Sequence, residues 1–224
     1  MNFGGINQGA NYNVDIVMCI DATGSMAHII DEVKANALSF YQKFVDEMNN
    51  QGKNVDQLRI KVIAFRDYAV DSEPMVISDF FVLDEQKAEF QNFVNKIEAM
   101  GGGDLPENGL EALALAINSD WTTEGAVRRH VILMYTDAEA KPLGVDKTDN
   151  SDMPTSIADL RALWEGQMSK MENRAKRLLI FAPEVEPWNN FVGWQHTFHT
   201  ASEAGKGLED VDITTCINLL VRSI

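Results

Sequence analysis

Basic residues are scarce in this chain. Its 19 lysines and arginines stand against 34 aspartates and glutamates, which leaves a net charge of −15 over 224 residues. A nucleic-acid backbone or an anionic membrane surface requires a basic face on the protein that binds it. The composition therefore argues against nucleic acid and membrane as the main partner. The acidity fits either a solvated surface or a local carboxylate cluster that holds a cation.

Long apolar runs are also absent. No stretch reaches the roughly 20 residues that a membrane-spanning helix needs. The opening residues MNFGGINQGANYN have neither the basic nor the apolar region of a secretory signal, so we expect a cytoplasmic protein. Residues 1–12, rich in Gly and Asn, are expected to be a flexible lead-in, and residues 13–224 to form a single domain. Nothing in the sequence specifies an oligomeric state.

Cysteine and histidine are few, with two and four residues. Cys19 and Cys216 fall in an expected core strand and an expected terminal helix, where a cysteine usually serves as a small buried hydrophobe. His196 and His199 are three residues apart in an expected strand and so point to opposite faces, which argues against a shared zinc ion.

Apolar runs alternate with helical patterns along the chain, which indicates an α/β domain with a mostly parallel sheet and helices on both faces. The run VDIVMCI is continuous rather than alternating, as is typical of a strand covered on both faces. Strands are expected at residues 14–20, 58–68, 75–83, 130–137, 178–183 and 196–201. Helices are expected at residues 26–48, 84–100 (with Asp84 as the N-cap), 106–117, 156–177 and 211–224.

Oxygen-bearing side chains follow several of these strands. In open α/β sheets, ligands bind at the carboxyl ends of the strands. Hard oxygen donors suit Mg²⁺, Mn²⁺ or Ca²⁺ rather than zinc. Three segments supply such donors: Asp21, Thr23 and Ser25 after the first strand, Asp104 and Glu107 in the loop GGGDLPENG, and Asp137 directly after VILMYT.

Simpler roles exist for several of these residues. Asp21 and Asp104 could each cap the helix that follows, and Glu107 could be a solvated glutamate in the first turn of a helix. Arg66 and Asp67 in the segment AFRDY could form a pair at the end of the second strand or lie at the ligand edge.

The segment DATGSM, residues 21–26, resembles the Asp-x-Ser/Thr-x-Ser motif of von Willebrand factor A (VWA) domains, known as the metal-ion-dependent adhesion site. The order of motifs is similar over residues 13–224, and AFRDY and GGGDLPENGLEAL resemble the bacterial and α-kinase-associated branch. The resemblance implies the VWA fold, a Rossmann-like open sheet. It also implies that Asp21, Thr23 and Ser25 are first-loop metal ligands and that Asp137 is the last-strand carboxylate, often bound through water.

The middle ligand is less clear from this resemblance. Many family members carry a threonine after the glycines, where this chain has Asp104. The sequence DLPE, residues 104–107, is similar to the integrin β-type Asp-x-Pro-Glu arrangement, in which the glutamate binds the metal. We expect Asp104 and Glu107 both to lie near the metal, without assigning which of them touches it.

The resemblance implies a divalent-cation-dependent protein-interaction module without catalysis, here a cytoplasmic adaptor. Mg²⁺ is the expected ion, and Mn²⁺ or Ca²⁺ also suits the donors. A partner protein's Asp or Glu would complete the coordination. One alternative is a scaffold with a purely structural metal. A less favoured one is a Mg²⁺-dependent phosphohydrolase that uses Asp21, although Thr23 stands where such a loop carries its second aspartate.

Overall fold

The fold is built on one seven-stranded sheet in the order β3-β2-β1-β5-β6-β7, with β4 also paired to β2. The computed structural model describes residues 10–101, 106–145, 153–166, 170–202, 204 and 213–224. The strands are β1 (Asn11–Asp21), β2 (Asn54–Phe65), β3 (Met75–Ile77), β4 (Phe81–Val82), β5 (Val127–Tyr135), β6 (Lys176–Pro183) and β7 (Thr197–Ser202).

The sheet is mostly parallel. β1 pairs in parallel with β2 and with β5, and β6 pairs in parallel with β5 and with β7. Only β3 and β4 run antiparallel, both against β2. β1 is buried along almost its whole length, and its apolar side chains alternate between two cores, with Ile16 and Met18 in one and Val17 and Cys19 in the other. This explains why its sequence is a continuous apolar run.

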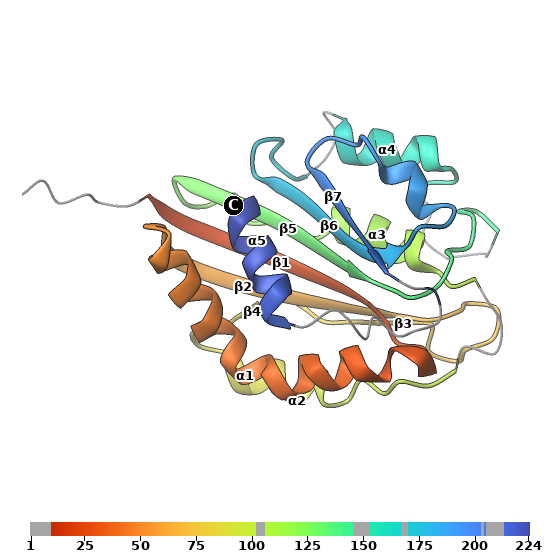
Figure 1. The fold of residues 1–224 in the computed structure, drawn as a ribbon, viewed down its shortest axis with the longest axis horizontal. Helices are drawn as coiled ribbons and strands as arrows, with labels where there is room; N and C mark the ends of the chain where they lie inside the picture. Colours follow the sequence, from red (N-terminus) through yellow and green to blue (C-terminus); the bar gives the residue numbers. More distant parts are fainter. Residues whose placement is uncertain (1–9, 102–105, 146–152, 167–169, 203, 205–212) are drawn as a thin grey trace, which may run out of the picture.

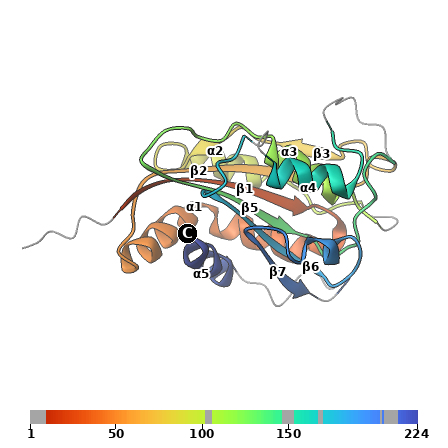
Figure 2. The ribbon, with the colours of Figure 1, turned by 90° about the horizontal axis from the view of Figure 1, so that it is seen from above.

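Helices cover both faces of the sheet (Figures 1 and 2). One core forms beneath α1, α2 and α5, and the other beneath α3 and α4. The helices are α1 (Ala27–Asn50), α2 (Lys87–Val94), α3 (Gly109–Ile117), α4 (Ile157–Glu165) and α5 (Ile213–Ser223). The predicted α/β class with helices on both faces is confirmed. Among the helices of the described residues, none has the length and apolar character to cross a membrane.

The sheet differs from the prediction at two places. Residues 75–83 form two short strands instead of one, because Ser78 interrupts them. The Ser78 hydroxyl accepts a hydrogen bond from the amide of Val62 (2.9 Å) and donates to the carbonyl of Asp79 (2.7 Å). In addition, β1 begins at Asn11, two residues before the expected start of the domain.

Two of the expected helices are much shorter than predicted, and α2 covers only Lys87–Val94 of the expected residues 84–100. Asp84 is not an N-cap, since α2 begins at Lys87 after Gln86, whose side-chain oxygen accepts from the amide of Val82 (2.8 Å). The expected long helix over residues 156–177 is only α4, which ends at Glu165 where Gly166 becomes extended. The helical pattern continued past this glycine, but residues 173–175 form a turn instead.

Candidate functional site

The candidate site lies at the carboxyl edge of the sheet, between β1 and β5. The next strand in sequence, β2, pairs with β1 on one side, whereas β5 pairs with β1 on the other side. The order in which strands are added to the sheet therefore reverses at β1. Crevices at such reversals are the usual ligand-binding places of open α/β sheets. Asp21 is the last residue of β1, and Asp137 follows the end of β5 by two residues.

Asp21 is completely buried and accepts three hydrogen bonds from uncharged donors. Its Oδ1 accepts from the amide of Thr23 (3.0 Å) and from the Thr23 hydroxyl (2.6 Å). Its Oδ2 accepts from the hydroxyl of Thr136 (2.7 Å). Within the described residues Asp21 forms no ion pair, so its charge is surrounded by hydrogen-bond donors but lacks a counterion.

The protonation equilibrium of Asp21 reflects this environment. Burial raises the pKa of its carboxyl group to about 6, and the nearby Asp137 carboxylate contributes a smaller increase. The hydrogen bonds from Thr23 and Thr136 act in the opposite direction. A buried carboxylate with a raised pKa is one whose charged form would gain from a nearby cation.

Ser25 and Asp137 join the same cluster. The turn of residues 24–26 continues directly into α1 and presents Ser25, which is exposed, while Asp137 is buried. The Ser25 hydroxyl donates to Asp137 Oδ1 (2.9 Å), and it lies 3.5 Å from the Thr23 hydroxyl. The four predicted ligands of the first loop and the last strand are therefore brought together.

Glu107 lies before α3 and is not part of its first turn, contrary to one of the roles considered for it. It forms an isolated bridge with Ala140: its amide donates to the carbonyl of Glu139 (3.0 Å), and its carbonyl accepts from the amide of Lys141 (2.8 Å). α3 begins only at Gly109. The bridge buries Glu107, which is 1% exposed, so the alternative that it is a solvated glutamate is wrong.

The carboxylate of Glu107 has no hydrogen-bond partner in the part of the chain that the structure describes. Its pKa is raised to about 8, mainly by burial and to a smaller extent by the carboxylates of Asp21, Asp67 and Asp71, while Lys141 acts in the opposite direction. A buried acid of this kind must be either protonated or compensated by a positive charge.

Asp67 and Arg66 do not form an ion pair with each other, which was one of the two roles considered for them. Asp67 is buried and accepts from the ammonium group of Lys141 and from the amide of Ala69 (2.7 Å). Arg66 turns away to backbone carbonyls. The only cation found beside Glu107 and Asp67 in the described part of the chain is thus Lys141.

The donor set suits a hard divalent cation. Carboxylate and hydroxyl oxygens are the ligands that Mg²⁺ and Ca²⁺ prefer, and the unpartnered oxygens of Glu107 add to them. Three or more Asp, Glu, His or Cys side chains do not come together as a metal-binding group within the described ranges. A cation here would therefore depend on the hydroxyls of Thr23 and Ser25. Asp104 lies outside the described residues.

Sequence reasoning missed two contributors to this edge. The hydroxyl of Thr136 donates to Oδ2 of Asp21 and also accepts from the amide of Ala138 (3.1 Å). Its place directly before Asp137, at the end of a strand adjacent to β1, was the available signal. Lys141 gave no local signal, because only the fold of the loop after β5 brings it to Asp67.

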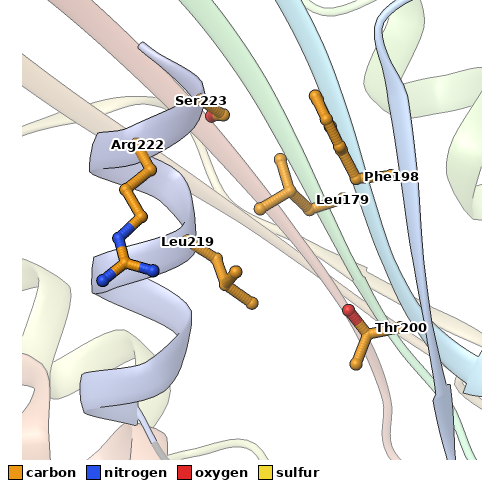
Figure 3. A pocket seen from close by; sticks show the side chains of 6 residues that line it. All are labelled: Leu179, Phe198, Thr200, Leu219, Arg222 and Ser223. Atoms are coloured by element: carbon orange, nitrogen blue, oxygen red, sulfur yellow. The ribbon is translucent and has the colours of Figure 1, made fainter.

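A separate cavity lies on the α5 side of the sheet (Figure 3). It has a volume of about 160 Å³ and is bounded by β6, β7 and α5. Its lining includes none of the candidate ligands and consists of Leu179, Phe198, Thr200, Leu219, Arg222 and Ser223.

Solved structures of similar fold come from several sources. The pilus adhesin SpaC from Lactobacillus rhamnosus GG aligns with a TM-score of 0.57 at 8% identity, over 94% of this chain and 30% of the adhesin. A von Willebrand factor type A protein from Catenulispora acidiphila aligns with a TM-score of 0.51 at 16% identity, over 95% and 42%. Proximal thread matrix protein 1 from the mussel byssus gives 0.50 at 13% identity, over 96% and 47%.

The chain thus spans less than half the length of each of these three proteins, and identities this low show the fold alone. No curated protein sequence matches the chain. The von Willebrand factor A domain family matches residues 15–177, which include Asp21, Thr23, Ser25, Glu107 and Asp137. The match covers well over half of the sequence, and the chain belongs to the von Willebrand factor A domain family.

Proposed function

We propose that this chain is a divalent-cation-dependent protein-interaction module, with Mg²⁺ as its physiological ion. Asp21, Thr23 and Ser25 would hold the ion, and Asp137 would bind it directly or through water. A bound cation of this type supplies a positively charged centre that can accept an oxygen ligand from another protein. The chain's own residues orient that centre; they carry out no bond-breaking chemistry in this proposal.

One observation carries the proposal: the hydrogen-bonded cluster of Asp21, Thr23, Ser25 and Asp137 at the reversal point of the sheet. Hydroxyl ligands leave a cation more electrophilic than carboxylates do, because they do not neutralise it. Exposed Ser25 places one side of the cluster at the surface. A partner carboxylate could therefore reach the cation from that side.

The surroundings of the site define the partner further. Val70 and Met100 are large apolar residues with exposed fractions of 56% and 49%. Asp71 and Gly101, their chain neighbours, lie against each other, so the two loops are adjacent. Together with the acidity of the chain, this favours a partner that presents a single carboxylate among apolar or basic side chains, rather than an acidic stretch.

Glu107 decides between this role and a purely structural metal. If Glu107 joined Asp21 and Asp137 at a divalent cation, the ligand charges would exceed that of the ion. Such a site would bind metal more tightly and attract an external carboxylate less. The burial of Glu107 and its lack of a hydrogen-bond partner among the described residues are the observations that favour a structural metal. Asp104, the other middle candidate, would act in the same direction.

Calorimetric titration tests the proposal. We expect Mg²⁺ and Mn²⁺ to bind the wild-type chain at one site and Asp21→Asn to abolish this binding. Asp56→Asn is the matched control, because Asp56 is an exposed aspartate near the opposite end of β2. Circular dichroism would verify that both variants fold.

The same titrations separate the two readings of the metal. Glu107→Gln should leave Mg²⁺ affinity nearly unchanged for a protein-interaction site, and reduce it strongly for a structural one. Wild-type protein that binds neither ion at millimolar concentration, or binding that survives Asp21→Asn, would contradict the proposed function altogether.

A further inference from the structure

Arg66 connects three separate segments at the carboxyl edge. Its side chain is 5% exposed and donates three hydrogen bonds, all to backbone carbonyls. Nε reaches Ala22 (3.2 Å), Nη1 reaches Glu73 (2.9 Å) and Nη2 reaches Glu98 (2.7 Å). The carbonyls belong to the motif loop, the turn before β3 and the segment that follows α2.

The choice of partners is unusual for a buried arginine. Buried charges are normally paired with an opposite charge, yet Arg66 forms no ion pair within the described ranges. A planar guanidinium with five N–H donors in a fixed fork can instead satisfy several carbonyls at defined angles. The geometry of Arg66 therefore fixes the relative positions of three loops, whereas lysine offers only a flexible point charge.

Ala22 is the residue that matters most among these contacts, because it lies between Asp21 and Thr23. Its amide donates to the carbonyl of Phe65 (2.8 Å), which extends the pairing of β1 with β2. Its carbonyl accepts from Arg66 and also from the amide of Met100 (3.0 Å). Both the amide and the carbonyl of Ala22 are thus fixed by hydrogen bonds.

The main chain of Arg66 is equally engaged. Its amide donates to the carbonyl of Pro74 (2.8 Å), and its carbonyl accepts from the amide of Asn108 (3.3 Å), the residue next to Glu107. Asn108 Oδ1 in turn accepts from the amide of Tyr68 (2.9 Å). Arg66 therefore links the motif loop to the segment that carries the buried glutamate.

We propose that Arg66 is a positioning residue for the metal site: its guanidinium holds the loop at Ala22 in the conformation that directs Asp21, Thr23 and Ser25 toward Asp137. This inference rests on the proposed function. Arg66 does not touch the metal, and its effect is transmitted through the backbone of Ala22. Replacement of Arg66 should therefore weaken metal binding while Asp21 itself is intact.

Two substitutions and one matched control test this role. Arg66→Lys keeps the positive charge but loses the planar guanidinium with its several donors. Arg66→Gln removes the charge, so this variant cannot fail to fold because of an unpaired buried cation. Arg59→Lys is the control: Arg59 lies on the same strand, but its fork binds Asp15 and the carbonyl of Asp120. All four proteins, including wild type, would be titrated with Mn²⁺ by calorimetry.

Hydrogen exchange of the metal-free proteins supplies a second readout. We expect both Arg66 variants to bind Mn²⁺ about tenfold or more weakly and to exchange the amides of residues 23–26 faster than wild type. Arg59→Lys should lower the denaturation midpoint but leave Mn²⁺ affinity within about twofold and the exchange at residues 23–26 unchanged. Mass spectrometry on peptides from this loop would record the exchange.

The outcomes separate this inference from the proposed function. A wild-type chain that binds no Mn²⁺ refutes the proposed function and this role of Arg66 together. If wild type binds Mn²⁺ and either folded Arg66 variant binds it equally well, the role of Arg66 alone is refuted. Equal weakening by Arg59→Lys would also overturn it, because the effect would then follow from general destabilisation.

Discussion

Asp15, in the first half of β1, and Asp21, at its carboxyl end, have contrasting environments. They are six residues apart, point to the same face of the sheet and are both fully buried. Asp15 accepts two hydrogen bonds from Arg59 (2.8 and 2.5 Å) and one from the amide of Thr122 (2.7 Å). Asp21 receives only hydroxyl and amide donors.

The arginines of the neighbouring strand show the same contrast. Arg59 pairs with the aspartate across from it. Arg66, one residue beyond the end of β2, donates to carbonyls, so that Asp21 has no counterion among the described residues. The charge of Asp15 is thus compensated within the fold. The carboxyl end holds an excess of buried negative charge, which is the condition under which an external cation would bind.

The largest expected effect comes from breaking the ion pair of Asp15 with Arg59. Asp15→Asn should lower the free energy of unfolding by about 3 kcal/mol, because it leaves Arg59 without its buried partner. Asp21→Asn in metal-free protein should cost about 1 kcal/mol or less, since the asparagine retains an acceptor and the repulsion from Asp137 disappears. Urea denaturation in EDTA measures both.

Metal titration of the same two variants sharpens the comparison. Asp15→Asn should keep the wild-type affinity for Mg²⁺ as long as it folds, while Asp21→Asn should lose it. Larger destabilisation by Asp21→Asn than by Asp15→Asn would show that Asp21 is held mainly as part of the fold.

A second prediction concerns pH. Because the pKa of Glu107 is raised from 4.5 to about 8, the unfolded chain releases this proton at lower pH than the folded chain. The folded state is not penalised below about pH 4.5, and its stability falls as the pH rises toward 8. One carboxyl group contributes a slope of at most about 1.4 kcal/mol per pH unit.

Glu107→Gln should remove that contribution. Urea denaturation in EDTA between pH 7 and 8 would compare the two proteins; in this range Asp21, whose pKa is raised to about 6, is mostly ionised. Wild type should lose more stability across it than the variant. Equal slopes would mean that Glu107 is already compensated in the metal-free fold.

The smallest expected effect concerns Thr136. Thr136→Val removes the 2.7 Å hydrogen bond to Asp21 Oδ2 and should weaken Mg²⁺ binding about tenfold, as changes beside metal ligands commonly do. Thr197→Val is the control, because the hydroxyl of Thr197 contacts only the carbonyl of Gln195 (3.3 Å) among the contacts described for it. Calorimetry that found identical losses in the two variants would remove Thr136 from the site.

The sheet and the first-loop residues could be predicted from the sequence because their signals are local. The continuous apolar run before Asp21 indicates a strand buried on both faces, and parallel neighbours bring the ends of β1 and β5 to one edge. The approach of Asp21 to Asp137 follows from these two facts. The length of α4 could not be predicted in this way, because the helical periodicity of the sequence continues beyond Gly166.

Long-range backbone contacts account for what could not be predicted. Glu107 is buried through its bridge with Ala140, a residue 33 positions later, and its local sequence is typical of a helix start. The partners of Arg66 are carbonyl groups, which every residue possesses and no side chain signals. The adjacent letters of Arg66 and Asp67 suggested a pair that the fold does not make.

A crystal structure of the wild-type chain grown with Mn²⁺ tests the central claim most directly, because anomalous scattering locates the ion. The account predicts one strong anomalous peak bounded by the side chains of Asp21, Thr23 and Ser25, with Asp137 beside it and Asp15 unoccupied by metal. An ordered motif loop without a peak, or a peak only at other carboxylates, would contradict it.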